Sequence, residues 1–219
     1  MKNKKTIYHF IIDKSGSMAG MQHQAVEGFN VQVKTLQELK QAYPDQDYTV
    51  SLTFFNENLR DIISNGKVEQ LVPMNPKTFL PNGSTALLDA IGKSIYQIKS
   101  DFGPALSNDE ASVVMVIITD GEENASRFYT YHEIARMIKE LDETEKWTFS
   151  FLGADLDAIH TSKMLNIRRE NVISFSKSNY SGMMGDVSDS IRCYENSKAE
   201  GKTKNNIFDI FDKKDRRKS

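Results

Sequence analysis

The feature that most constrains the fold is a series of short apolar segments, which are separated by longer segments with helical periodicity. The most apolar of them covers residues 111–119 (ASVVMVIIT), and the first covers residues 6–12 (TIYHFII). Both lack the alternation of apolar and polar side chains that marks a strand with one solvated face. They therefore predict strands that are buried on both faces, as in a parallel sheet covered by helices.

The same two patterns extend over most of the chain. Further strands are predicted over residues 48–55, 59–63, 146–152 and 171–175. Apolar side chains at helical spacing predict helices over residues 21–43, 86–102, 131–141, 157–165 and 183–194. Residues 59–63 follow the preceding strand so closely that a hairpin, and hence an antiparallel edge strand, is expected. Residues 68–81 contain three prolines and are expected to be irregular, with one weak strand-like piece.

Strands that alternate with helices in this way imply crossover connections and a sheet covered on both faces. The expected fold is α/β and doubly wound, of the Rossmann-like kind. It has a mostly parallel six-stranded sheet, one short antiparallel edge strand, and helices on both faces. In such sheets ligands bind at the carboxyl ends of the strands, near the point where the strand order reverses.

The periodic pattern ends near residue 196, so residues 1–196 are predicted to form the domain and residues 197–219 a basic tail. Eight Lys or Arg and four Asp or Glu give this tail a net charge of +4, which leaves about −6 for the rest of the chain. Such a composition predicts disorder. Four apolar tail residues leave open a short docking motif: Ile207, Phe208, Ile210 and Phe211.

Composition excludes several classes of protein. The chain of 219 residues can bury a core without disulfides, and its single cysteine, Cys193, is expected to be a semi-buried apolar residue. A net charge of −2 recruits neither nucleic acid nor an anionic membrane surface. No segment approaches the roughly 20 apolar residues of a membrane span. The first apolar segment, residues 7–12, is too short for the apolar region of a signal peptide. A cytoplasmic protein is expected.

Three predicted loops near strand ends carry side chains with oxygen atoms. The first follows strand 6–12, the second precedes helix 86–102, and the third follows strand 111–119. Their candidate ligands are Asp13, Ser15, Ser17, Thr85 and Asp120. Alternation along the first loop places its three side chains on one side, and Gly16 lets the backbone curl so that both hydroxyls converge.

Hydroxyl and carboxylate oxygens are hard ligands that suit Mg²⁺ or Mn²⁺, whereas zinc favours His and Cys. The four histidines are scattered and form no ligand pair. With two carboxylates, the site is expected to hold its cation modestly and to leave it open to one more carboxylate. The positive end of the helix that starts near Gly20 opposes the cation, and Asp13 and Asp120 offset that effect.

This ordered set resembles the metal-ion-dependent adhesion site (MIDAS) of the von Willebrand factor A (vWA) family. DKSGSM at residues 13–18 is similar to the family's Asp-x-Ser-x-Ser element, GSTAL at residues 83–87 to its threonine loop, and IITDGE at residues 117–122 to its later aspartate. The resemblance covers about residues 6–196. It is greatest for short intracellular members of bacterial and phage type.

The resemblance implies a role for each residue. Ser15, Ser17 and Thr85 would coordinate the metal through their hydroxyls, and Asp13 and Asp120 would act directly or through water. The expected function is a protein-interaction module that is not an enzyme. Its partner would be a protein that donates a carboxylate to the metal, with ATPase and stress-response systems as candidate sources.

Several alternatives stand beside this reading. A magnesium-dependent phosphohydrolase would need a carboxylate two residues after Asp13, where Ser15 stands. A nucleotide-binding protein would need a glycine-rich phosphate loop, and neither usual pattern is present. A scaffold with a vestigial site is disfavoured because all five ligand positions carry a residue that can coordinate a metal.

Ser84 is expected to cap the following helix, and residues 122–124 are expected to form a solvated loop. Met18 and Met21 are either a contact surface or core residues.

Overall fold

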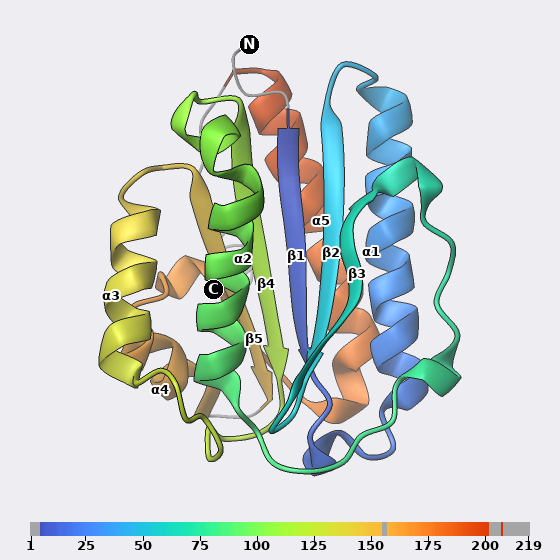
Figure 1. Cartoon of the computed structure of the whole chain (residues 1–219). Helices are drawn as coiled ribbons and strands as arrows, with labels where there is room; N and C mark the ends of the chain where they lie inside the picture. Colours follow the sequence, from blue (N-terminus) through green and yellow to red (C-terminus); the bar gives the residue numbers. More distant parts are fainter. Residues whose placement is uncertain (1–4, 155–156, 202–206, 208–219) are drawn as a thin grey trace, which may run out of the picture.

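A mixed β-sheet forms the middle layer of the molecule (Figure 1). The computed structural model describes residues 5–154, 157–201 and 207, and within them the sheet has six strands in the order β3-β2-β1-β4-β5-β6. These are β1 (Lys5–Asp13), β2 (Asp47–Phe55), β3 (Leu59–Lys67), β4 (Ala111–Thr119), β5 (Trp147–Ala154) and β6 (Val172–Phe175). All neighbouring pairs are parallel except β2 and β3, which confirms the predicted sheet.

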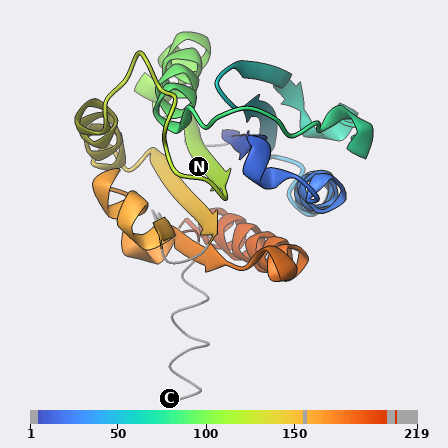
Figure 2. The same cartoon turned by 90° about the horizontal axis from the view of Figure 1, so that it is seen from below.

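Helices cover both faces of the sheet, as Figures 1 and 2 show from two directions. They are α1 (Gln22–Ala42), α2 (Leu87–Ser107), α3 (Tyr131–Asp142), α4 (Asp157–Met164) and α5 (Tyr180–Ala199). The helices α1 and α5 pack on one face, and α2 and α3 pack on the other. Strand β4 is buried along its whole length because it is central and covered on both sides. No helix of the described residues is long and apolar enough to cross a membrane.

The strand order reverses next to β1. From β1 the chain proceeds to β2 and β3 on one side, and then returns through α2 to β4 on the other side. The carboxyl ends of β1 and β4 therefore lie side by side, at the kind of switch point where α/β sheets bind ligands. This places Asp13 and Asp120 at the same edge of the sheet.

The edge strand β3 is nine residues long, so the short strand predicted over residues 59–63 was wrong in its length. Its residues are partly buried or exposed and none is fully buried, and its pairing with β2 shifts register twice. An exposed edge strand carries few apolar side chains, so its second half has no apolar signal in the sequence. Residues 68–81 form two short 3-10 turns, at Val68–Gln70 and Pro76–Thr78, and the expected strand-like piece is absent.

Two helices are also longer than predicted. Helix α2 continues through Pro104, which lies in its last turn, and α5 extends beyond the predicted residues 183–194 at both ends. Cys193 is exposed on α5, which corrects the expected semi-buried position.

Of the apolar tail residues, Ile207 is buried in the core and its N–H donates to Asn171 Oδ1 at 3.0 Å. Phe208, Ile210 and Phe211 lie outside the described residues, so the tail remains a prediction.

A polar cluster interrupts the otherwise apolar face of the sheet under α2. His9 of β1 is only 4% exposed, and its Nε2 lies 2.9 Å from Thr53 Oγ1 of β2. The Thr53 hydroxyl donates to Asp61 Oδ1 of β3 at 2.7 Å. Burial lowers the pKa of His9 to about 4, although the nearby negative charge of Asp61 acts in the opposite direction.

This burial predicts a specific pH dependence of stability. The pKa of His9 falls from about 6.5 in the unfolded chain to about 4 in the folded one. The folded state then binds fewer protons between these values, so stability is full above pH 6.5 and is lost as pH falls towards 4. The expected loss is about 3 kcal/mol. Urea unfolding between pH 7 and 4 should show it, and His9→Gln should remove this part of the slope.

The matched control is His23→Gln, which changes an exposed histidine on α1. It should keep the pH slope of the wild-type protein. A slope that is equal in all three proteins would contradict the buried neutral state of His9.

Candidate metal centre

Three loops meet at the carboxyl edge of the sheet and bring the predicted ligands together. Asp13 is the last residue of β1, Asp120 directly follows β4, and Thr85 lies two residues before α2. The N–H of Gly16 donates to Gly83 O at 3.0 Å, which joins the first loop to the second. The fold thus converts three segments that are distant in sequence into one site.

Asp13 is the buried centre of this edge. Its Oδ2 accepts a hydrogen bond from Thr119 Oγ1 at 2.6 Å, and its Oδ1 accepts from the Ser15 N–H at 2.7 Å. Burial raises the pKa of the Asp13 carboxyl, and the nearby Asp120 also raises it, whereas the hydrogen bonds from Thr119 and Ser15 lower it. A buried carboxylate with this raised pKa is stabilised by any cation that comes close.

The two serines connect the first loop to Asp120. Ser15 Oγ and Ser17 Oγ are 3.0 Å apart, and Ser17 Oγ donates to Asp120 Oδ1 at 2.7 Å. Ser15 is buried, whereas Ser17 is exposed. This row of oxygens leads from the interior to the surface, as a site that accepts a ligand from outside requires.

Thr85 joins the same group of oxygens, as the surroundings of Gly121 show. A Cβ atom at Gly121 would lie 2.9 Å from Thr85 Oγ1, 3.3 Å from Ser17 Oγ and 3.6 Å from Asp13 Oδ2. One small volume is therefore bounded by oxygens of the first two loops and by Gly121 of the third, and any side chain at position 121 would intrude on it. The residues present fit a hard divalent cation, because carboxylate and hydroxyl oxygens are the donors that such ions prefer.

Asn124 holds Thr85 in place, although the sequence suggested only a solvated loop here. Its Oδ1 accepts from the Thr85 N–H at 2.9 Å, and Thr85 O accepts from the N–H groups of Asn124 and Ala125. Asn124 is not itself a candidate metal ligand, but it orients Thr85, which is one. The closeness of Asn124 to Asp120 was a signal in the sequence. Its contact with Thr85, which lies on another loop, could not be read from the sequence.

Glu123 caps helix α2, which corrects two predictions. Its Oε2 accepts from the Leu88 N–H at 3.0 Å, and its carboxylate also accepts from Ala125 and Ser126. Ser84 does not cap the helix, since the N-cap residue is Ala86 and has no side-chain bond. A cap from another loop replaces the local one, so the solvated-loop prediction is wrong for Glu123.

Met18 and Met21 are both buried, so they are core residues and do not form a contact surface.

Lys177 is a further residue that the sequence analysis missed. It lies between β6 and α5, and its Nζ is 2.6 Å from Asp120 Oδ2. The same Nζ donates to Ser17 O at 2.7 Å, and the Asp120 side chain has no exposed surface. An ammonium group thus neutralises one of the two carboxylates of the candidate metal centre.

The fold is that of a vWA-like domain, as similar solved structures show. No family model matches the sequence, and no curated protein matches it either. Similar solved structures include a von Willebrand factor type A protein from Catenulispora acidiphila, with a TM-score of 0.56 and 18% identity over 85% of this chain and 42% of that one. The ArnB paralog VWA2 from Sulfolobus acidocaldarius has a TM-score of 0.56 and 14% identity over 84% and 45%.

A third similar structure is the manganese-loaded TRAP protein of Plasmodium vivax. Its TM-score is 0.56 and its identity 14%, over 84% of this chain and 73% of that one. The chain spans less than half of the length of the Catenulispora and Sulfolobus proteins. At these identities the likeness establishes the vWA-like fold, and the functions of the whole proteins do not follow from it.

The ion pair of Lys177 predicts competition between its ammonium group and a bound metal. We expect Lys177→Met to raise the affinity for Mn²⁺ by roughly threefold to tenfold, because the cation then has no positive neighbour to displace. Isothermal titration calorimetry measures this affinity. Lys14→Met is the matched control, because it removes the same charge from the first loop but its Nζ bonds Asn82. An equal gain in both variants, or no gain in either, would contradict the competition.

The contact of Asn124 predicts a second effect on metal affinity. Asn124→Ala removes the acceptor for the Thr85 N–H and should weaken Mn²⁺ binding by up to about tenfold. Asn124→Asp keeps an acceptor oxygen and should bind Mn²⁺ at least as well as the wild-type protein. If the two variants were equally weakened in the same titration, the hydrogen bond would not be the cause.

Proposed function

We propose that this domain is a protein-interaction module that binds an acidic side chain of a partner protein through a divalent cation, Mg²⁺ or Mn²⁺. The observation that carries this proposal is the convergence of oxygens from Asp13, Ser17 and Thr85 on one volume beside Gly121. Ser15 and Asp120 complete the set through their hydrogen bonds with Ser17. Hydroxyl donors neutralise little of the metal's charge, so the bound cation favours a further carboxylate.

Similar structures support a metal in this role. The TRAP protein was described as manganese-loaded, and a mussel byssus protein, PTMP1, was described with a zinc-occupied MIDAS motif. PTMP1 has a TM-score of 0.53 and 18% identity over 85% of this chain and 48% of that one. The two differ in metal, so the choice of Mg²⁺ or Mn²⁺ for this chain rests on its oxygen-only donors.

The surroundings of Asp13 support binding without catalysis. A nucleophilic aspartate needs a carboxylate oxygen that can reach a substrate, yet both Asp13 oxygens accept internal hydrogen bonds and the residue is fully buried. Ser15 occupies the place where a phosphohydrolase would carry its second carboxylate. We therefore propose that the domain turns over no substrate.

Two exposed apolar side chains support recognition of a protein surface. Leu80 is 68% exposed and lies on the loop that leads to Thr85, and Phe128 is 69% exposed on the loop that follows Asp120. Both side chains belong to loops that also carry residues of the metal centre, and we propose that they contact the partner protein. We propose a cytoplasmic partner from an ATPase or stress-response system.

Removal of a single ligand oxygen tests the proposal. Thr85→Val keeps the shape of a buried side chain but removes the hydroxyl, so metal affinity should fall by at least about tenfold. Capture of a partner by the immobilised domain should then require Mg²⁺, disappear with EDTA, and disappear in Thr85→Val. Quantitative mass spectrometry of the captured proteins, together with calorimetry of the metal, measures both.

Thr78→Val is the matched control, because Thr78 Oγ1 bonds Asn75 O in the second 3-10 turn. It should leave metal affinity and capture unchanged. Capture that persists in EDTA and in Thr85→Val would show that the domain acts as a scaffold and that partner binding does not need the metal site. Hydrolysis of a generic phosphoester that Asp13→Asn abolishes would overturn the non-catalytic assignment.

A further inference from the structure

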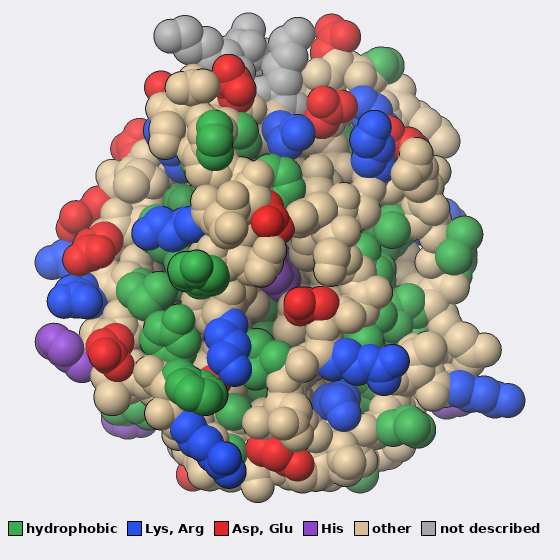
Figure 3. Space-filling view, viewed as in Figure 1, with side chains coloured by type: hydrophobic (Ala, Val, Ile, Leu, Met, Phe, Trp, Pro, Cys, Tyr) green, Lys and Arg blue, Asp and Glu red, His purple; other side chains and the backbone are tan. Residues whose placement is uncertain are grey.

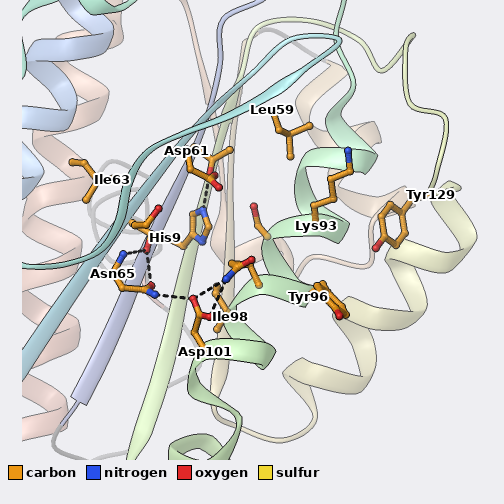
Figure 4. Close-up of a pocket in the computed structure, with 15 residues that line it drawn as sticks. His9, Leu59, Asp61, Ile63, Asn65, Lys93, Tyr96, Ile98, Asp101 and Tyr129 are labelled. Atoms are coloured by element: carbon orange, nitrogen blue, oxygen red, sulfur yellow. Dashed lines mark hydrogen bonds between the residues drawn. The ribbon is translucent and has the colours of Figure 1, made fainter.

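A cavity opens between β3 and α2, and none of the candidate metal ligands lines it. It has a volume of about 410 Å³, which is within the range of small-molecule sites. Figure 3 shows this face of the molecule, and Figure 4 shows the cavity with its lining side chains. His9 on its floor is four residues before Asp13, about 13 Å along β1.

The floor of the cavity holds a buried acceptor without a partner. Thr53 uses its only hydrogen in the bond to Asp61, so it must accept its second bond from the Nε2–H of His9. The other ring nitrogen, Nδ1, is then unprotonated. It is buried and has no hydrogen-bond partner among the described residues. A buried polar atom without a partner needs an explanation, and this one belongs to a side chain that lines the cavity.

The rim of the cavity carries two carboxylates. Asp61 and Asp101 are both exposed and line it from β3 and α2, and Figure 4 shows His9 between β3 and α2 with Asp61 beside it. The one lysine of the lining, Lys93, has its Nζ 4.7 Å from the centre of the Phe128 ring. The cavity is therefore negative in sum and would repel an anion.

Apolar and aromatic surface completes the lining. Tyr96 is 71% exposed at the rim, and Leu59, Ile63 and Tyr129 contribute apolar contact area. The lining suits an organic molecule with a polar, donating head and a short apolar body.

We propose that this cavity binds a small organic cation, whose ammonium or guanidinium N–H donates to His9 Nδ1 and whose charge is balanced by Asp61. The ligand satisfies the buried acceptor, and its carbon chain lies against the tyrosines of the rim. At neutral pH His9 is uncharged, since burial lowers its pKa to about 4, so it does not repel the cation. This site is independent of the proposed metal-dependent function.

Solution NMR of the full chain with Mg²⁺ present tests the proposal. The probes are n-butylammonium and n-butylguanidinium, compared with n-butanol and butyrate. At least one cation should cause saturable shifts of amides on β1, β3 and α2, and should move the ¹⁵N resonance of His9 Nδ1. Butanol and butyrate should bind at least about tenfold more weakly, because they lack the charge-assisted bond.

Two variants distinguish binding in the cavity from a general attraction of cations to the acidic surface. Asp61→Asn keeps an acceptor for Thr53 but loses the charge, and should weaken cation binding by at least about tenfold. Asp45→Asn changes an exposed carboxylate outside the cavity and should leave binding unchanged. The proposal is overturned if neither cation gives saturable shifts there, if butanol binds equally well, or if Asp61→Asn has no effect.

Discussion

The hydrogen bond from Thr119 Oγ1 to Asp13 Oδ2 joins the ends of β1 and β4 at the point where the strand order reverses. It fixes the buried carboxylate of Asp13 in the candidate metal centre. Once Asp13 is held, its other oxygen orders the first loop through the Ser15 N–H. The serine hydroxyls and Asp120 then follow as a connected row. A buried charge is stable only with such partners, so the geometry of the whole edge depends on this contact.

The loops that surround this contact are held by acidic and amide side chains. Glu123 caps α2, Asn124 fixes Thr85, and the carboxylate of Asp89 accepts from three successive N–H groups, at residues 127–129. These bonds replace the regular backbone pairing that loops lack. They explain how an irregular segment can present Thr85 with the accuracy that a ligand site requires. The loop between β4 and α3 also contributes Tyr129 to the lining of the cavity between β3 and α2.

The two sites have different electrostatics. At the sheet edge, Lys177 already neutralises Asp120, so the charge available to a metal is small. In the cavity, Asp61 and Asp101 outnumber the one lysine, whose charge lies over an aromatic ring. In our two proposals, one domain thus offers a hydroxyl-rich site for a hard cation and an acidic cavity for an organic cation. The strand β1 connects them, since His9 and Asp13 are on the same strand.

The sequence by itself determined the central strands, the main helices and the five candidate ligands, because continuous apolar runs and the spacing around Asp13 are local patterns. It did not determine the full length of β3, whose exposed residues carry no apolar signal. Only the tertiary structure decided that Lys177 reaches Asp120, that Glu123 replaces Ser84 as the helix cap, and that His9 lies beneath a cavity. Each of these contacts joins segments far apart in the chain, and their distance is set by packing across the sheet.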